Sequence, residues 1–383
     1  MMTTSTRAGR YVRQPEAYSA FIPASLPPDP SINMDAEMIA LLSDADRALG
    51  RLDGSIQTLP DPGLFVFMYV RKEAVLSSQI EGTQSSLNDV LEAEAAISDP
   101  ERPRDVDEVL NYVEAMTYGL ARLDELPIST RLLREIHEHL LRGVRGAKLT
   151  PGELRTSQNW IGPGGATLSE ATYVPPPPHE LGAALADFER FLHEEEPIPA
   201  LVKIGLAHAQ FETIHPFLDG NGRIGRLLIT FLLCEKGTLM TPVLYISHYF
   251  KSHRDEYYSL LQNIRDTGDW ESWLKFFLRG MAEVSREATD TARRIVALRE
   301  NHRSLIVNNF GRVAGNALVV LERLYSRPYI SVNDIATLTD VSYQAASNLM
   351  DKFVEFGLLM EITGQARNRR FRYTPYVDIF AGE

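Results

Sequence analysis

Residues 214–226 read Ile-His-Pro-Phe-Leu-Asp-Gly-Asn-Gly-Arg-Ile-Gly-Arg and lie between two apolar segments. Upstream, apolar residues recur at helical spacing over 201–214, which predicts a helix. That helix should end at His215, because Pro216 disfavours helical geometry at the residue before it. Downstream, the apolar residues of 223–234 predict a second helix. The polar stretch therefore joins the end of one helix to the start of another.

The residues that open the second helix are of the kinds that bind phosphate. Gly220, Asn221 and Gly222 stand at its start, where backbone N–H groups without helical partners favour an anion. Arg223 and Arg226 lie three apart on its first turn, so both should project from neighbouring positions. Their guanidinium groups suit bidentate contact with phosphate oxygens.

A carboxylate and an imidazole complete the predicted site. Asp219 precedes the glycines, and a carboxylate beside bound phosphates usually holds a divalent ion, most often Mg²⁺. His215 suits proton transfer, and we expect the carbonyl groups at the helix end to favour its protonated form. Taken singly, these residues also fit a turn or a structural ion pair. The combination favours function, although neither a Walker A loop nor a GxGxxG pattern is present.

Residues 215–226 resemble the HPFx(D/E)GNGRxxR motif of the Fic (filamentation induced by cAMP) family and match every fixed position. In that family the motif transfers AMP from ATP to a protein hydroxyl. The resemblance implies that His215 is the general base and that Asp219 holds Mg²⁺ against the phosphates. The residues it places on ATP are Thr213, Gly220, Asn221, Gly222, Arg223, Ile224, Gly225, Arg226 and Tyr258, of which Tyr258 also fits a core position.

A second motif lies N-terminal to this site. Residues 61–82 predict a helix capped by glycine, and Glu81 is oddly placed there because its charge opposes the helix dipole. Ser77, Glu81 and Gly82 resemble the (S/T)xxxE(G/N) inhibitory motif of the Fic family. That resemblance implies that Glu81 pairs with Arg226 and blocks binding of the γ-phosphate. A solvated glutamate is the alternative.

The stretch 143–178 is rich in glycine and proline. Strand-like pieces at 157–161 and 171–174 predict a β-hairpin. Residues 152–162 resemble the Fic flap, which holds the target segment by strand addition; a plain surface hairpin is the alternative. The expected target-docking residues are Thr156, Ser157, Gln158, Asn159, Trp160 and Ile161.

Residues 311–383 differ in character from the rest of the chain. Three predicted helices precede two strand-like pieces, an order that resembles a winged helix-turn-helix module. Eight basic and eight acidic residues leave this module no net positive charge, whereas DNA affinity rests largely on phosphate neutralisation. A protein-interaction or dimerisation role is therefore favoured over DNA binding. The candidate DNA contacts are Ser342, Tyr343, Gln344 and Asn348 for bases and Arg367, Arg369, Arg370 and Arg372 for phosphates.

We therefore predict a mainly α fold: a Fic helical core with a β-hairpin flap and a C-terminal winged helix-turn-helix domain. Elsewhere, a helix at 32–51 should end near Gly50, one helix should cover 245–265, and 270–281 and 283–299 should be separate helices. The expected organisation is an extended arm at 1–31, an N-terminal helical region at 32–128, the catalytic core at 129–283, a connector helix at 284–310 and the winged-helix domain at 311–383.

Composition sets further limits. The 383 residues are 44% hydrophobic and 23% charged, which is ordinary for a globular protein. The net charge of −12 argues against a protein that coats nucleic acid over its whole surface. The single cysteine, Cys234, excludes an internal disulfide. No signal core or bilayer-length apolar run is present, so a cytoplasmic location is expected.

The function implied by the resemblance is protein adenylylation, in which AMP passes from ATP to a Ser, Thr or Tyr hydroxyl and pyrophosphate is released. One alternative is removal of AMP by the same site, with Glu81 positioning water. Another is a nucleotide-sensing, DNA-binding transcription regulator. The expected partners are ATP with Mg²⁺, a protein substrate that can be the chain itself, and a second copy in a homodimer. Nucleic acid bound through 311–383 is a further candidate, and no membrane partner is expected.

Overall fold

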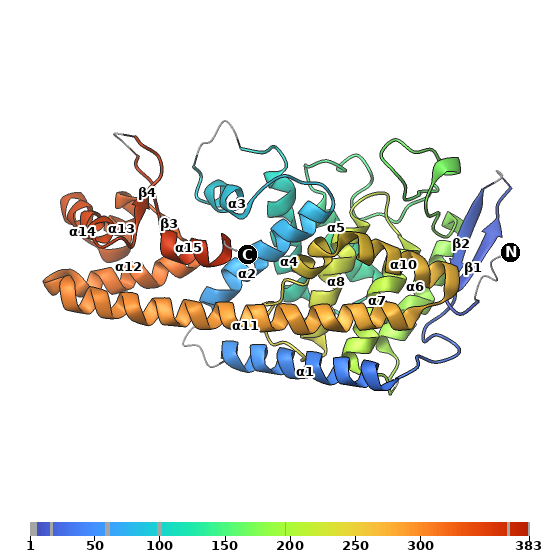
Figure 1. Cartoon of the computed structure of the whole chain (residues 1–383). Helices are drawn as coiled ribbons and strands as arrows, with labels where there is room; N and C mark the ends of the chain where they lie inside the picture. Colours follow the sequence, from blue (N-terminus) through green and yellow to red (C-terminus); the bar gives the residue numbers. More distant parts are fainter. Residues whose placement is uncertain are drawn as a thin grey trace.

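The computed structural model is mainly helical, as predicted, and is elongated along one long helix (Figure 1). That helix, α11 (Trp270–Asn309), runs from the helices around residues 214–226 to the C-terminal module, and α1 (Ala36–Gln57) packs along it. The structure describes residues 6–15, 18–57, 62–97, 102–195, 197–365 and 368–381.

The centre of this helical region is the helix pair α7 (Ala200–Ile214) and α8 (Asn221–Glu235). Residues 201–214 of α7 are all buried, including several polar and charged side chains. Both helices occur where the sequence predicts them, although α8 begins two residues earlier. Six further helices surround or support this pair: α2 (Pro62–Ile80), α4 (Val106–Arg122), α5 (Thr130–Leu140), α6 (Pro178–His193), α9 (Ser247–Ser252) and α10 (Arg254–Thr267).

Three of the predicted helix limits are wrong. The helix α1 continues past Gly50 to Gln57, because Leu52 and Ile56 extend the face that packs on α11. The helix predicted over 245–265 is broken at His253, which takes a non-helical conformation between α9 and α10. The two helices predicted within 270–299 are one, since buried residues continue along α11 without interruption. The predicted limit between core and connector, 283/284, therefore falls inside a helix.

The N-terminal segment forms a β-hairpin where an extended arm was predicted. Strands β1 (Gly9–Arg13) and β2 (Ser19–Pro23) pair antiparallel. Phe21 is fully buried and its backbone N–H donates to Val174 O at 2.9 Å. Burial of Phe21 therefore orders a segment whose prolines predicted an extended arm. Residues 1–5 and 16–17 lie outside the described part of the chain.

The C-terminal segment contains the three predicted helices followed by the two predicted strands, with additional elements. A three-stranded antiparallel sheet has the order β3-β5-β4. The sequence predicted β4 and β5 but not β3. The final helix α15 was also not predicted. The elements are α12 (Ala314–Ser326), β3 (Tyr329–Ile330), α13 (Val332–Thr339), α14 (Tyr343–Glu355), β4 (Met360–Glu361), β5 (Phe371–Arg372) and α15 (Thr374–Ala381). Among the described residues, no helix has the length and apolar character needed to cross a bilayer.

Candidate active site

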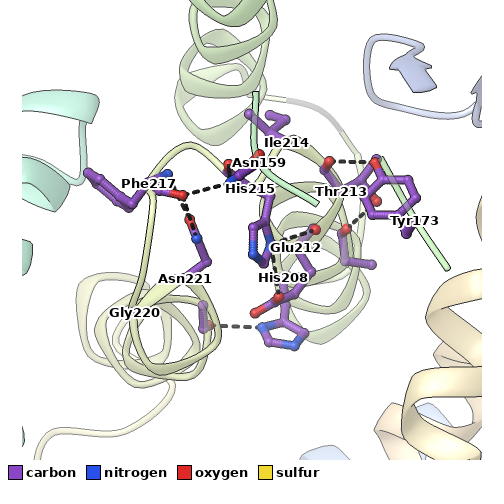
Figure 2. Close-up of polar contacts among 12 residues, drawn as sticks. Asn159, Tyr173, His208, Glu212, Thr213, Ile214, His215, Phe217, Gly220 and Asn221 are labelled. Carbon is purple, nitrogen blue, oxygen red and sulfur yellow. Dashed lines mark hydrogen bonds and ion pairs between the residues drawn. The ribbon is translucent and has the colours of Figure 1, made fainter. Parts of the chain in front are cut away.

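His215 lies immediately after α7 in a left-handed backbone conformation, with φ 50° and ψ 61°. Its N–H donates to Phe211 O at 2.9 Å, and Pro216 prevents the helix from continuing. A positive φ is strained for a residue other than glycine and needs support from its surroundings. Arg155 supplies this support by donating from Nε to His215 O at 2.9 Å, and Asn159 Nδ2 donates to Phe217 O at 2.8 Å (Figure 2).

The His215 imidazole is neutral rather than protonated. Its Nδ1 lies 3.4 Å from Glu212 O and 3.9 Å from Glu212 Oε2. Burial, reinforced by the charges of Arg265 and Arg155, lowers the pKa of His215 to about 3. The prediction of a protonated ring is therefore wrong, because desolvation and these two cations outweigh the helix-end carbonyls. A neutral ring is the form that can accept a proton.

The loop between the helices is closed by its own side chains. Phe217 N donates to Asn221 Oδ1 at 2.9 Å, and Asn221 Nδ2 donates to Phe217 O at 2.8 Å (Figure 2). Gly220 has φ +77°, a conformation that glycine adopts without strain. Asn221 is buried and so fixes the loop rather than facing a ligand. The first turn of α8 is thereby held ready for an anion.

Arg226, on the second turn of α8, is buried and donates to three acceptors. Its Nε donates to Ser77 Oγ at 2.8 Å, and Nη2 donates to Ser77 O at 3.0 Å and Glu81 Oε1 at 2.7 Å. Desolvation alone would raise the pKa of Glu81, but the charge and hydrogen bond of Arg226 hold that pKa below its usual value. The pair named from the sequence is therefore present, next to Gly82, whose φ of +98° turns the chain away from α2.

Glu81 also lies against the start of α8. A Cβ atom at Gly222 would overlap Glu81 Oε1 and come within 3.0 Å of Arg226 Nη1. Only glycine leaves room for the carboxylate there. The carboxylate thus lies beside the first turn of α8, at the end of the helix that favours an anion.

Arg223 faces a different direction from Arg226. Its Nη1 donates to Glu108 Oε2 of α4 at 3.2 Å, and Nη2 lies 3.8 Å from Asp219 Oδ1. The side chain is 1% exposed, and Nε is buried with no hydrogen-bond partner among the described residues. The two arginines therefore do not converge as their spacing suggested.

Asp219 is held in place through its backbone, and its carboxylate is partly exposed. Its Oδ1 accepts from Gly220 N at 2.7 Å. His137 Nδ1 accepts from Gly152 N at 2.9 Å, so His137 Nε2 donates to Asp219 O at 3.0 Å. The described residues contain no cluster of three or more His, Cys, Asp or Glu side chains suited to a metal. A single carboxylate fits Mg²⁺ that takes its other ligands from phosphate oxygens and water.

Of the outlying nucleotide contacts, only Tyr258 is accessible, being 40% exposed beside Arg254. Thr213 is buried, and its Oγ1 donates to Ala209 O at 2.8 Å. Ile224 belongs to the core. A Cβ at Gly225 would overlap Glu212 Oε1, so this glycine permits close packing of α8 on α7. These three residues shape the site rather than line it.

Family models match most of this region. The model described as Fic/DOC family N-terminal matches residues 39–121, and the Fic/DOC family model matches residues 127–233. The chain belongs to the Fic/DOC family.

Two curated proteins are similar to this chain in sequence. The chain is 29% identical over 253 residues to protein adenylyltransferase Fic of Drosophila yakuba, a match that covers 64% of this chain and 45% of the relative. It is 31% identical over 217 residues to the protein of the same name in Drosophila grimshawi, covering 55% and 40%. The chain therefore spans less than half of the length of these curated relatives.

The fold is similar to that of two solved structures. A Fic family protein from Desulfovibrio desulfuricans G20 has a TM-score of 0.60 at 21% identity, with 89% of this chain and 97% of that chain covered. A Fic domain containing signaling protein from Bacteroides thetaiotaomicron VPI-5482 has a TM-score of 0.52 at 18% identity, with 65% and 95% covered. These likenesses concern the fold alone.

The flap of this Fic protein is not a regular hairpin, contrary to the prediction. The strand-like pieces form one antiparallel bridge, Ile161 to Tyr173, and the turn η1 (Leu168–Glu170) lies between them. Side chains tie the stretch to the active-site loop instead, and the prolines that follow have no N–H for pairing. The predicted docking residues divide accordingly: Thr156, Ser157 and Trp160 are exposed, Gln158 and Ile161 are half-buried and Asn159 is buried.

The arginines predicted to contact DNA phosphates pair with acids of their own module. Arg369 lies 3.2 Å from Glu361. Arg370 lies 3.3 Å from Asp334, and Arg372 lies 3.3 Å from Asp378. Arg367 lies outside the described residues. These ion pairs reduce the charge free for phosphate, and DNA binding by this module stays a prediction.

Several residues of the site were not predicted from the sequence. Glu108 reaches Arg223 from a helix more than a hundred residues upstream, a pairing that no local pattern indicates. His137 positions Asp219 by a hydrogen bond to its backbone carbonyl, a contact that the sequence does not indicate. One signal was available: Glu212 is a carboxylate three residues before His215, in a helix with several buried polar residues. Arg155 and Arg265, which set the charge around the imidazole, are likewise distant in sequence.

Proposed function

We propose that this Fic protein transfers AMP from ATP to a Ser, Thr or Tyr hydroxyl of a protein and releases pyrophosphate. The observation that carries the proposal is a neutral imidazole, His215, beside a helix start that favours an anion and presents Arg226. The curated relatives with about 30% identity are named protein adenylyltransferases. Such transfer depends mainly on positioning and charge stabilisation, which these residues supply.

The proposed step uses the Nε2 atom of His215. Because Nδ1 faces the acceptor Glu212 O, the single N–H hydrogen of the neutral ring is assigned to Nδ1, which leaves the lone pair of Nε2 free. The target hydroxyl gives its proton to Nε2 while its oxygen attacks the α-phosphorus. The bond from that phosphorus to the bridging oxygen breaks, and pyrophosphate leaves. Mg²⁺, held by Asp219 and phosphate oxygens, would neutralise the negative charge that develops on pyrophosphate.

Glu81 would keep this site closed to ATP. Its carboxylate occupies both Arg226 and the first turn of α8, where a phosphate would bind. A carboxylate and a phosphate compete for one guanidinium because both form charge-assisted hydrogen bonds with it. Removal of the Glu81 side chain should therefore free Arg226 for the nucleotide.

Intact-protein mass spectrometry tests the proposal. Purified Glu81→Gly protein incubated with ATP and Mg²⁺ should gain the mass of one or more AMP groups, and wild type should gain less. Glu81→Gly/His215→Ala should gain none while still binding ATP. Glu125→Gly, at a mostly exposed loop residue remote from the site, is the matched control and should behave as wild type. The proposal would be contradicted if Glu81→Gly protein transferred AMP neither to itself nor to proteins of a lysate.

Hydrolytic removal of AMP from a modified protein is the alternative for the wild type, with Glu81 positioning the attacking water. Incubating protein that was AMP-modified by the Glu81→Gly variant with the wild type separates the two. If the modified protein loses AMP only when Glu81 is present, the wild type removes AMP.

A further inference from the structure

Glu212 is a buried carboxylate of the site to which nothing above assigns a role. It lies on the last turn of α7, and its side chain is 8% exposed. Figure 2 shows it beside the His215 ring, with Oε2 3.9 Å from Nδ1. Its other oxygen, Oε1, is buried and has no hydrogen-bond partner among the described residues. Such a group destabilises a fold, so its presence calls for a function.

Two cations near His215 disfavour a positive charge on its ring, and the Glu212 carboxylate can offset their effect. Arg155 donates to His215 O, and Arg265 Nη2 donates to Glu212 O at 3.2 Å. Both cations oppose a positive charge on the ring, and a base with a pKa far below neutral takes up a proton poorly. A negative group beside Nδ1 would stabilise the imidazolium as it forms.

We propose that Glu212 is a positioning residue of the transfer reaction, holding the Nδ1–H tautomer of His215 and stabilising the imidazolium. This inference rests on the proposed function. The hydroxyl proton moves to Nε2, the hydrogen on Nδ1 stays in place, and the Glu212 carboxylate remains ionised. The oxygen–phosphorus bond forms and the bond to pyrophosphate breaks as described above. A histidine oriented by a carboxylate is a general means of strengthening a base.

The charge of Glu212 depends on groups from several elements. Burial raises the pKa of Glu212 to about 7; Arg226 of α8 and Arg265 of α10 oppose this rise, and Glu81 adds to it. Tyr257 and Tyr258 of α10 face the same carboxylate, which raises the pKa of both hydroxyls further. The transfer rate should therefore rise with pH as Glu212 ionises. In Glu81→Gly the loss of a negative neighbour should move this rise to lower pH.

The test compares pH–rate profiles of AMP transfer in the Glu81→Gly background. Glu212→Gln should lower the plateau rate by at least about tenfold and remove the rise with pH, with the KM for ATP changed less than about twofold. Glu212→Asp, which keeps the charge, should retain the rise, and Glu125→Gln should match the parent. An unchanged plateau and profile in Glu212→Gln would overturn the inference.

Histidine NMR separates failure of this inference from failure of the proposed function. If Glu81→Gly transfers no AMP, the proposed function fails, and the ¹⁵N signals of His215 still report on the pair. At a pH above about 7, where Glu212 is ionised, Glu212→Gln should reduce the fraction of the Nδ1–H tautomer of His215. Identical tautomer signals of His215 at that pH, with and without Glu212→Gln, would show that Glu212 does not act on the ring.

Discussion

Replacing Glu212 with glutamine should make the protein more stable at alkaline pH relative to wild type. The pKa of Glu212 rises from 4.5 to about 7 on folding, chiefly through burial. A raised pKa of an acid means that stability is complete below the unfolded value and is lost as pH rises through the folded value. The full shift corresponds to roughly 3 kcal/mol, most of which falls between about pH 5 and about pH 8.5.

Urea unfolding of wild type and Glu212→Gln at these two pH values measures this difference. The free energy of unfolding of the variant relative to wild type should increase by roughly 2–3 kcal/mol on going from the acidic to the alkaline condition. Glu73, whose pKa burial also raises to about 7, is present in both proteins and cancels. Glu125→Gln should show no such change. Equal pH dependence in wild type and Glu212→Gln would refute the argument that this carboxyl is protonated by burial.

Three further predictions concern neighbouring residues. In the Glu81→Gly background, Gly222→Ala should abolish ATP binding, because the added methyl group fills the position proposed for the anion. Calorimetry measures this binding, and retained binding would place the phosphates elsewhere. Glu108→Ala should destabilise the protein by about 3–5 kcal/mol, since it leaves buried Arg223 without its partner, and a thermal shift near zero would contradict this. Asp219→Asn should raise the Mg²⁺ concentration needed for half-maximal transfer at least about tenfold, whereas an unchanged requirement would remove Asp219 from the metal site.

The helices around the site could be predicted from local patterns. The apolar residues of 201–214, followed by Pro216, indicate both a buried helix and its end. Ser129 caps α5, its hydroxyl oxygen accepting a hydrogen bond from Leu132 N at 3.3 Å, and serine is a preferred residue at this position. By contrast, the continuity of α11 depends on its packing against α1 and on the C-terminal module. Tertiary contacts of this kind leave no local signal in the sequence.

The site itself was predicted in its residue types more accurately than in its geometry. Spacing places Arg223 and Arg226 on one turn, but their directions depend on Glu108 and Glu81, which lie far away in sequence. The charge state of His215 was predicted wrongly for the same reason, because the helix end is local whereas burial and Arg265 are not. The flap was predicted as a hairpin because alternation is visible in the sequence and the side-chain bonds of Asn159 to the loop are not.

The most direct measurement of the central claim compares α-labelled and γ-labelled ATP with Glu81→Gly protein in the presence of Mg²⁺. The account predicts that protein acquires label from the α-phosphate only and that His215→Ala abolishes it with ATP binding retained. Label from the γ-phosphate, or α-label that persists without His215, would contradict it.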